Sequence, residues 1–148
     1  MEIQPDFRDL LELFNKNSVE YVIVGGYALA FHGAPRYTGD LDILVNIGGD
    51  NPHKIMQTLK EFGFGAIGLS IRDFSEPGKV IQLGYPPVRI DIVTSISGVS
   101  WKEAFQDRVE GTYGGTPIYF IGRKQLVANK RTVGRQRDLA DLEALGEA

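Results

Sequence analysis

The segment YVIVGGYALAFHGAPRYTGDLDILV, residues 21–45, constrains the fold of this chain more than any other part of its sequence. An apolar stretch leads through Gly25 and Gly26 and a short apolar segment into a polar loop, and a second apolar stretch then begins with Asp-Leu-Asp. Side chains alternate across a strand, so Asp40 and Asp42 would point to the same face and repel each other. Such a pair requires either exposure to water or a bound cation.

Length and composition limit the class of protein. The chain has 148 residues and no sequence feature that divides it, so we expect a single domain over residues 1–148. A net charge of −3 argues against a general polyanion binder, and the absence of cysteine excludes disulfides, thiolate metal sites and cysteine nucleophiles. Neither a signal sequence nor a membrane-length apolar run is found, so we expect a cytoplasmic protein with no membrane partner.

Hydrophobic periodicity predicts alternating helices and strands. Apolar spacing, turn residues and capping signals predict helices over residues 7–14, 27–31, 52–62, 101–105, 123–131 and 135–145. Alternation and short apolar runs predict strands over residues 21–24, 40–45, 79–85, 88–96 and 116–122. This order of elements predicts one α/β (α+β) domain with a short mixed β-sheet.

A third aspartate occurs in a similar setting. In VRIDIVT, alternation places Arg89 and Asp91 on the face opposite the apolar residues. If this strand lies beside the first aspartate strand, Asp40, Asp42 and Asp91 converge. Three carboxylates suit Mg²⁺ or Mn²⁺, and a two-metal site can clamp the attacking and leaving oxygens of a phosphoryl transfer. The alternative is an ordinary solvated strand face.

The glycine pair and the basic C-terminal part are candidate phosphate-binding features. Gly25 and Gly26 let a backbone approach a ligand closely, although their spacing fits neither a P-loop nor a dinucleotide-binding fingerprint. Six basic residues and no acidic ones occur within residues 123–137: Arg123, Lys124, Lys130, Arg131, Arg135 and Arg137. The alternatives are a tight turn without ligand and a solvated pair of helices, with Arg137 and Asp141 as a surface pair.

The combination of these motifs resembles the nucleotidyltransferase superfamily that includes DNA polymerase β. The resemblance rests on a strand, Gly-Gly, a spacer, Asp-Leu-Asp on a strand and a later strand aspartate in RIDIV. PRYTGDLDI looks especially like the branch of AbiEii-type and MenT-type toxins. Members of that branch often carry an arginine and a threonine before the aspartate pair, as Arg36 and Thr38 precede it here. The tail KRTVGRQRDLADLEAL is similar to the end of those proteins, with Arg137 where they carry lysine.

The resemblance implies a minimal nucleotidyltransferase fold with helices mainly on one face of the sheet. It implies metal-dependent transfer of a nucleoside monophosphate from an NTP to an acceptor, with release of pyrophosphate. The implied catalytic and metal-binding residues are Asp40, Asp42 and Asp91. The implied nucleotide-binding residues are Gly25, Gly26, Arg36, Thr38, Lys130 and Arg135, with Asp138 orienting Lys130 or Arg135. Gly26 stands where many members carry serine, so backbone N–H groups would replace that hydroxyl.

Several acceptors and two other functions stay open from sequence. The acceptor would be tRNA, a protein hydroxyl or a small molecule. One alternative function is the toxin of a toxin–antitoxin pair that modifies tRNA and is silenced by a partner protein. The other is a nucleotide- or metal-binding module without turnover, against which the retention of three mutually repelling acids argues.

Overall fold

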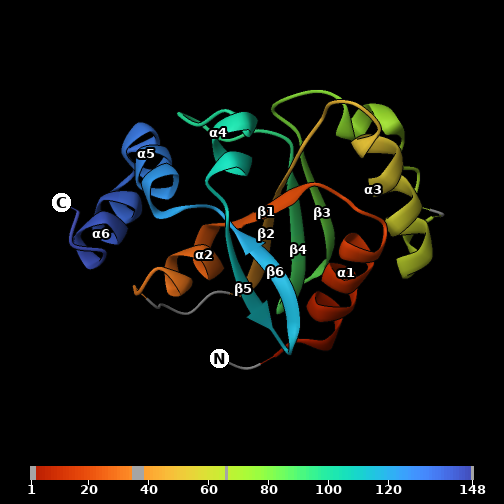
Figure 1. The fold of residues 1–148 in the computed structure, drawn as a ribbon, viewed down its shortest axis with the longest axis horizontal. Coiled ribbons are helices and arrows are strands. Elements are labelled where there is room, and N and C mark those ends of the chain that lie inside the picture. Colours follow the sequence, from red (N-terminus) through yellow and green to blue (C-terminus); the bar gives the residue numbers. More distant parts are fainter. Residues whose placement is uncertain (1–2, 35–38, 66, 148) are drawn as a thin grey trace.

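A computed structural model describes residues 3–34, 39–65 and 67–147. Within these residues, six strands form one sheet in the order β3-β4-β2-β1-β6-β5 (Figure 1). Strand β1 is antiparallel to β2 and parallel to β6, and β2 is parallel to β4. The strands are β1 (Tyr21–Val24), β2 (Asp40–Val45), β3 (Val80–Tyr85), β4 (Val88–Val93), β5 (Val109–Tyr113) and β6 (Thr116–Phe120). The expected α/β domain with a mixed sheet is confirmed.

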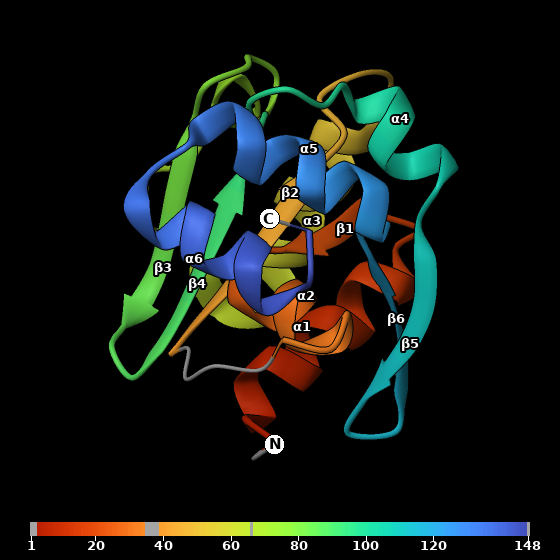
Figure 2. The ribbon, with the colours of Figure 1, turned by 90° about the vertical axis from the view of Figure 1, so that its left-hand side faces the viewer.

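Helices lie on both sides of this sheet. In Figures 1 and 2, α1 and α3 lie on one side, and α2, α5 and α6 lie on the other. The helices are α1 (Pro5–Lys16), α2 (Gly25–Phe31), α3 (Asn51–Leu59), α4 (Trp101–Gln106), α5 (Arg123–Val133) and α6 (Gln136–Ala144), with helical turns at Lys60–Phe64 and Ile71–Phe74. None of the helices in the described part of the chain is both long and apolar enough to cross a membrane.

The main core lies between α1, α3 and one face of the sheet. The apolar stripe of α1, represented by Phe7 and Phe14, is fully buried, and so are Leu41 and Ile43 of β2. Burying one such side chain contributes about 1.5–3 kcal/mol, so this stripe fixes the face that β2 turns inward. Because side chains alternate along the strand, the β2 aspartates are directed to the side of α2, α5 and α6.

The two C-terminal helices account for the difference from the expected arrangement with helices mainly on one face. They cover the aspartate side of the sheet in Figure 2. The sequence places Leu139, Leu142 and Leu145 at helical spacing in this segment, yet Leu139 is 53% exposed, whereas Leu142 and Leu145 are buried. Asp138 and Asp141 are buried in α6 instead. Charged pairs therefore form part of the inner surface of α6, which hydrophobic periodicity cannot predict.

Two local features differ from the sequence prediction. Strand β5 was not expected, because VEGTY contains glycine and glutamate, yet it pairs with β6 through a turn at Gly114 and Gly115. Both glycines have positive φ, as a two-residue hairpin turn requires, and this pair was the available signal. Helix α3 begins at Asn51 after Asp50 as its cap, one residue earlier than predicted.

Candidate active site

The turn between β1 and α2 depends on glycine at position 25. Gly25 has φ of +68°, in the left-handed region that favours glycine. Val24, the last residue of β1, pairs with Asp42 of β2, so the turn lies beside the aspartate strand. A Cβ added to Gly25 would overlap the Asp42 carboxylate. The position therefore excludes a side chain for two reasons, its backbone conformation and its closeness to Asp42.

Strands β2 and β4 bring the three predicted carboxylates to one face. In their parallel register, Asp42 lies opposite Asp91 and Asp40 lies opposite Arg89. Paired residues of adjacent strands point the same way, so the predicted convergence of the acids is confirmed. We call this group, Asp40, Asp42, Asp91 and Arg89, the aspartate face.

Arg89 provides a cation within the aspartate face. Its Nη2 lies 2.6 Å from Asp40 Oδ2 and 3.1 Å from Asp91 Oδ2. Its Nε lies 3.1 Å from Asp91 Oδ1. The sequence placed Arg89 on this face without giving it a role. Its spacing two residues before Asp91 on a strand was the signal that could have identified it.

One arginine does not balance three carboxylates. Burial, together with the negative charges of Asp91 and Asp40, raises the pKa of Asp42 to about 7, although Arg89 acts in the opposite direction. Without a further cation, Asp42 is therefore partly protonated near neutral pH.

A second charged group is buried between α5 and α6. Lys130 is 6% exposed, and its Nζ lies 2.8 Å from Asp141 Oδ2 and 3.5 Å from Asp138 Oδ1. Arg135 Nε donates to Asp138 Oδ2 at 2.7 Å. We call Lys130, Arg135, Asp138 and Asp141 the helix cluster. The hydrogen bonds that Asp138 accepts from Arg135 hold the pKa of Asp138 below its usual value.

The contacts within the helix cluster bear on two ideas from the sequence. Asp138 contacts both Lys130 and Arg135, the two residues that it was predicted to orient. The alternative that Arg137 and Asp141 form a surface pair is wrong, because Asp141 is 4% exposed and its carboxylate binds Lys130. Helical spacing alone could not show whether Asp141 pairs with Arg137 on the same helix or with Lys130 on α5.

A cavity of about 400 Å³ joins the glycine turn, the aspartate face and the helix cluster. A volume of this size is within the range of small-molecule sites. The sequence-predicted residues that line it are Gly25, Gly26, Asp40, Asp42, Lys130 and Arg135. Asp138 and Arg137, the latter predicted only as part of the basic stretch, also line it, and so does Asn129, which had no predicted role. Residues more than 100 positions apart in the chain thus face one cavity.

Three of the predicted site residues are absent from the described lining of this cavity. Asp91 belongs to the aspartate face but is only 8% exposed and is absent from the described lining. Arg36 and Thr38 lie outside the described residues. Among residues 3–34, 39–65 and 67–147, no group of three or more His, Asp or Glu side chains is arranged to hold a metal ion.

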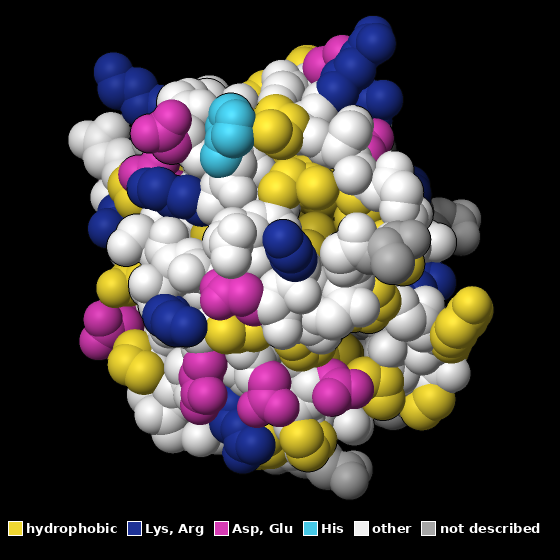
Figure 3. Space-filling model, turned by 90° about the vertical axis from the view of Figure 1, so that its right-hand side faces the viewer, with side chains coloured by type: hydrophobic (Ala, Val, Ile, Leu, Met, Phe, Trp, Pro, Cys, Tyr) yellow, Lys and Arg dark blue, Asp and Glu magenta, His cyan; other side chains and the backbone are white. Residues whose placement is uncertain are grey.

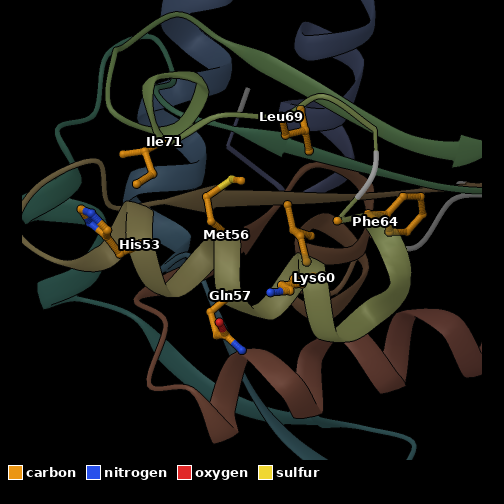
Figure 4. Close-up of a pocket in the computed structure, with 9 residues that line it drawn as sticks. His53, Met56, Gln57, Lys60, Phe64, Leu69 and Ile71 are labelled. Carbon is orange, nitrogen blue, oxygen red and sulfur yellow. The ribbon is translucent and has the colours of Figure 1, made fainter.

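Another cavity lies on the other side of the sheet and has different chemistry. It has a volume of about 220 Å³, and Met56, Leu69 and Ile71 extend into it beside α3 (Figure 4). Its described lining includes His53 and Lys60 but no carboxylate. Figure 3 shows this side of the molecule, where hydrophobic side chains gather near the centre among scattered charges. Of these two cavities, the one at the aspartate face is the one lined by carboxylates.

A comparison with protein families assigns the chain to one of them. Residues 4–146 match the family described as "nucleotidyltransferase of unknown function (DUF6036)", so the chain belongs to this nucleotidyltransferase family. A search of curated protein sequences found no significant match. The superfamily resemblance is confirmed at this level.

Solved structures show the same fold at low sequence identity. A candidate nucleotidyltransferase from Thermotoga maritima is 14% identical, with 99% of this chain and 97% of that chain covered and a TM-score of 0.61. The lincosamide antibiotic adenylyltransferase LnuA, bound to lincomycin, is 14% identical, with coverage of 99% and 98% and a TM-score of 0.57. ANT(2″)-Ia in complex with adenylyl-2″-tobramycin is 12% identical, with coverage of 94% and 84% and a TM-score of 0.59.

Proposed function

We propose that this member of the nucleotidyltransferase family transfers a nucleoside monophosphate from an NTP to an acceptor in a reaction that requires Mg²⁺ or Mn²⁺. The acceptor oxygen attacks the α-phosphorus, the bond from that phosphorus to the bridging oxygen breaks, and pyrophosphate leaves. The acceptor proton passes to a carboxylate. The observation that carries this proposal is the shared cavity, which brings the carboxylates of Asp40 and Asp42 together with a glycine turn and basic side chains.

The residues of the cavity fit a divalent cation. Asp40 and Asp42 face the cavity, and hard oxygen ligands of this kind are those that Mg²⁺ prefers. Burial raises the pKa of Asp42, and the negative charges of Asp91 and Asp40 raise it further; a cation would relieve both effects. When bound, the metal would supply charge stabilisation for the triphosphate and the attacking oxygen. Asp40 and Asp42 would hold it, and Asp91 would complete a second metal site or accept the acceptor proton.

The remaining residues would bind the triphosphate. The backbone N–H groups around Gly25 and Gly26 would hold the β- and γ-phosphates. Lys130 and Arg135 would neutralise charge on the leaving pyrophosphate, with Asp138 holding both in place. By resemblance, Arg36 and Thr38 would contact the phosphates from the loop before β2.

A hydroxyl of a small molecule is the acceptor class to test first. LnuA is an adenylyltransferase of nearly the same length as this chain, and ANT(2″)-Ia is bound to an adenylylated aminoglycoside. These likenesses indicate that a domain of this size is large enough for adenylyl transfer to a small acceptor. The acceptor class of this chain is inferred from fold alone.

A tRNA acceptor is the second candidate, in line with the resemblance to AbiEii-type and MenT-type toxins. Arg131, Arg135 and Arg137 are exposed along α5 and α6, where a polyanion could reach them. A toxin of this kind would act in the cytoplasm and would have an antitoxin-like protein partner. Expression should then arrest growth, and Asp42→Ala should abolish the arrest. Normal growth on expression of the wild-type protein would exclude this candidate.

The test of the main proposal uses ligand binding and product release together. The protein is titrated with Mn²⁺ and a non-hydrolysable NTP, with Asp40→Ala/Asp42→Ala as the control, and pyrophosphate release is then followed with NTP and candidate acceptors. We expect binding by the wild type and loss of binding in the double variant. Binding without pyrophosphate release from any acceptor would favour the module without turnover. No binding at millimolar ligand would overturn the proposal.

A further inference from the structure

Arg89 binds two of the carboxylates that a metal ion would use. It extends from β4 across to Asp40 of β2 and also contacts Asp91 on its own strand. The side chain of Asp40 is a third exposed and lines the cavity, so a carboxylate that accepts a hydrogen bond from Arg89 is also open to the candidate metal site. A carboxylate oxygen that accepts a hydrogen bond from a guanidinium is less available to a cation.

The contact between Arg89 and Asp91 is incomplete. Arg89 Nε and Asp91 Oδ1 lie 3.1 Å apart, yet both are buried and neither makes a hydrogen bond of acceptable geometry within the described residues. Buried polar atoms in this state are costly, and each requires an explanation such as an ion that binds there. The contact therefore leaves one donor of Arg89 and one acceptor of Asp91 unused in the metal-free aspartate face.

We propose that Arg89 is an internal counter-cation that competes with the divalent metal for Asp40, so that it stabilises the metal-free aspartate face and weakens metal binding there. This proposal rests on the metal-dependent function proposed above. Arg89 is a positioning residue, since it acts through Asp40 and Asp91. Metal binding would draw Asp40 away from Arg89 Nη2, while Arg89 would keep its contacts with Asp91.

The proposal predicts that Arg89 affects two quantities, the melting temperature without metal and the affinity for the metal. Removal of the guanidinium should lower the melting temperature without metal, because the repulsion among the three carboxylates is then no longer offset by Arg89. The same change should tighten metal binding, because Arg89 no longer competes with the metal for the Asp40 carboxylate. A merely structural Arg89 would show the first effect without the second.

The experiment measures Mn²⁺ binding to the full chain without nucleotide, by calorimetric titration and by the shift of melting temperature. Arg89→Gln is compared with the wild type and with Arg89→Lys, which keeps the charge and loses the forked geometry. Arg72→Gln is the matched control, since Arg72 Nε lies 2.6 Å from Glu76 Oε1 in an exposed pair outside the cavity. Circular dichroism establishes that each variant is folded.

We expect Arg89→Gln to bind Mn²⁺ about tenfold more tightly than the wild type, equivalent to ~1.4 kcal/mol. Arg89→Lys should show a smaller gain, and it carries the test if Arg89→Gln fails to fold. Arg72→Gln should leave the affinity unchanged. Equal or weaker binding by the Arg89 variants, with binding by the wild type intact, would overturn this inference and leave the proposed function standing. Absence of Mn²⁺ binding in every variant would overturn both.

Discussion

The aspartate face and the helix cluster are both groups of charged side chains beside the same cavity, but their charges are balanced differently. The aspartate face sets three carboxylates against the single guanidinium of Arg89. The helix cluster sets two carboxylates against Lys130 and Arg135. Burial and then the neighbouring carboxylates raise the pKa of Asp42 to about 7, whereas the hydrogen bond from Arg135 lowers the pKa of Asp138.

This difference indicates what each group does. A cluster with balanced charges is complete without a ligand, so it can hold Lys130 and Arg135 in a defined place. The aspartate face carries more negative than positive charge, so the proposed metal ion would gain most by binding there. Chemistry should therefore depend on the aspartate face, and the geometry of the cavity wall should depend on the helix cluster.

Replacement of Asp42 should cause the largest loss of activity without a loss of stability. We expect Asp42→Asn to reduce pyrophosphate release by about a thousandfold, the scale of losing a group that supports charge in the transition state. Its melting temperature without metal should not fall, because a repelling charge is removed. Asp9→Asn, at an exposed position of α1, is the control. Retention of more than a tenth of the activity would contradict the role given to Asp42.

Replacement of Lys130 should affect stability more than any change at the aspartate face. Lys130→Met removes the ammonium that is buried against Asp138 and Asp141, at an expected cost of ~3–5 kcal/mol in the free energy of unfolding. Chemical denaturation measures this loss. Lys124→Met, at an exposed position of the same helix, should cost little. Similar losses in the two variants would show that the helix cluster is not a balanced buried group.

A side chain at position 25 tests the closeness of the glycine turn to the aspartate face. Gly25→Ala should lose ~2 kcal/mol or more of stability, from left-handed backbone strain and from overlap with Asp42. Gly49 has a similar φ of +58° and open space for a Cβ, so Gly49→Ala reports the strain alone. Equal losses in both variants, measured by denaturation, would mean that the turn can move away from Asp42.

The raised pKa of Asp42 predicts a pH dependence of stability without metal. Folded Asp42 keeps its proton up to about pH 7, whereas an unfolded aspartate loses it above 3.8, so stability from this group is full below pH 3.8 and declines toward pH 7. The slope is at most ~1.4 kcal/mol per pH unit. Denaturation curves from pH 4.5 to 7.5 should show this decline as the difference between wild type and Asp42→Asn. A difference that does not change with pH would contradict the assigned pKa.

Much of the fold follows from periodicity in the sequence. The α1 stripe, the alternation in β2 and β4, and the glycines after β1 predicted their elements because burial imposes a period of 3.6 on a helix and of 2 on a strand. The predictions failed where other interactions replaced burial of apolar groups. Leu139 is exposed because buried aspartates occupy the inner surface of α6, and β5 forms through its hairpin with β6 rather than through its own propensity.

The sequence by itself determined that Asp40 and Asp42 point to one face of β2 and that Asp91 points away from the apolar residues of β4, because alternation is a local property of an extended backbone. Tertiary structure decided which charges meet. The parallel pairing of β2 with β4 brings Arg89 onto Asp40, and the packing of α6 on α5 gives Asp141 to Lys130 rather than to Arg137. Ion pairing depends on distances of a few ångströms between segments far apart in the chain, and only the folded arrangement of the segments sets those distances.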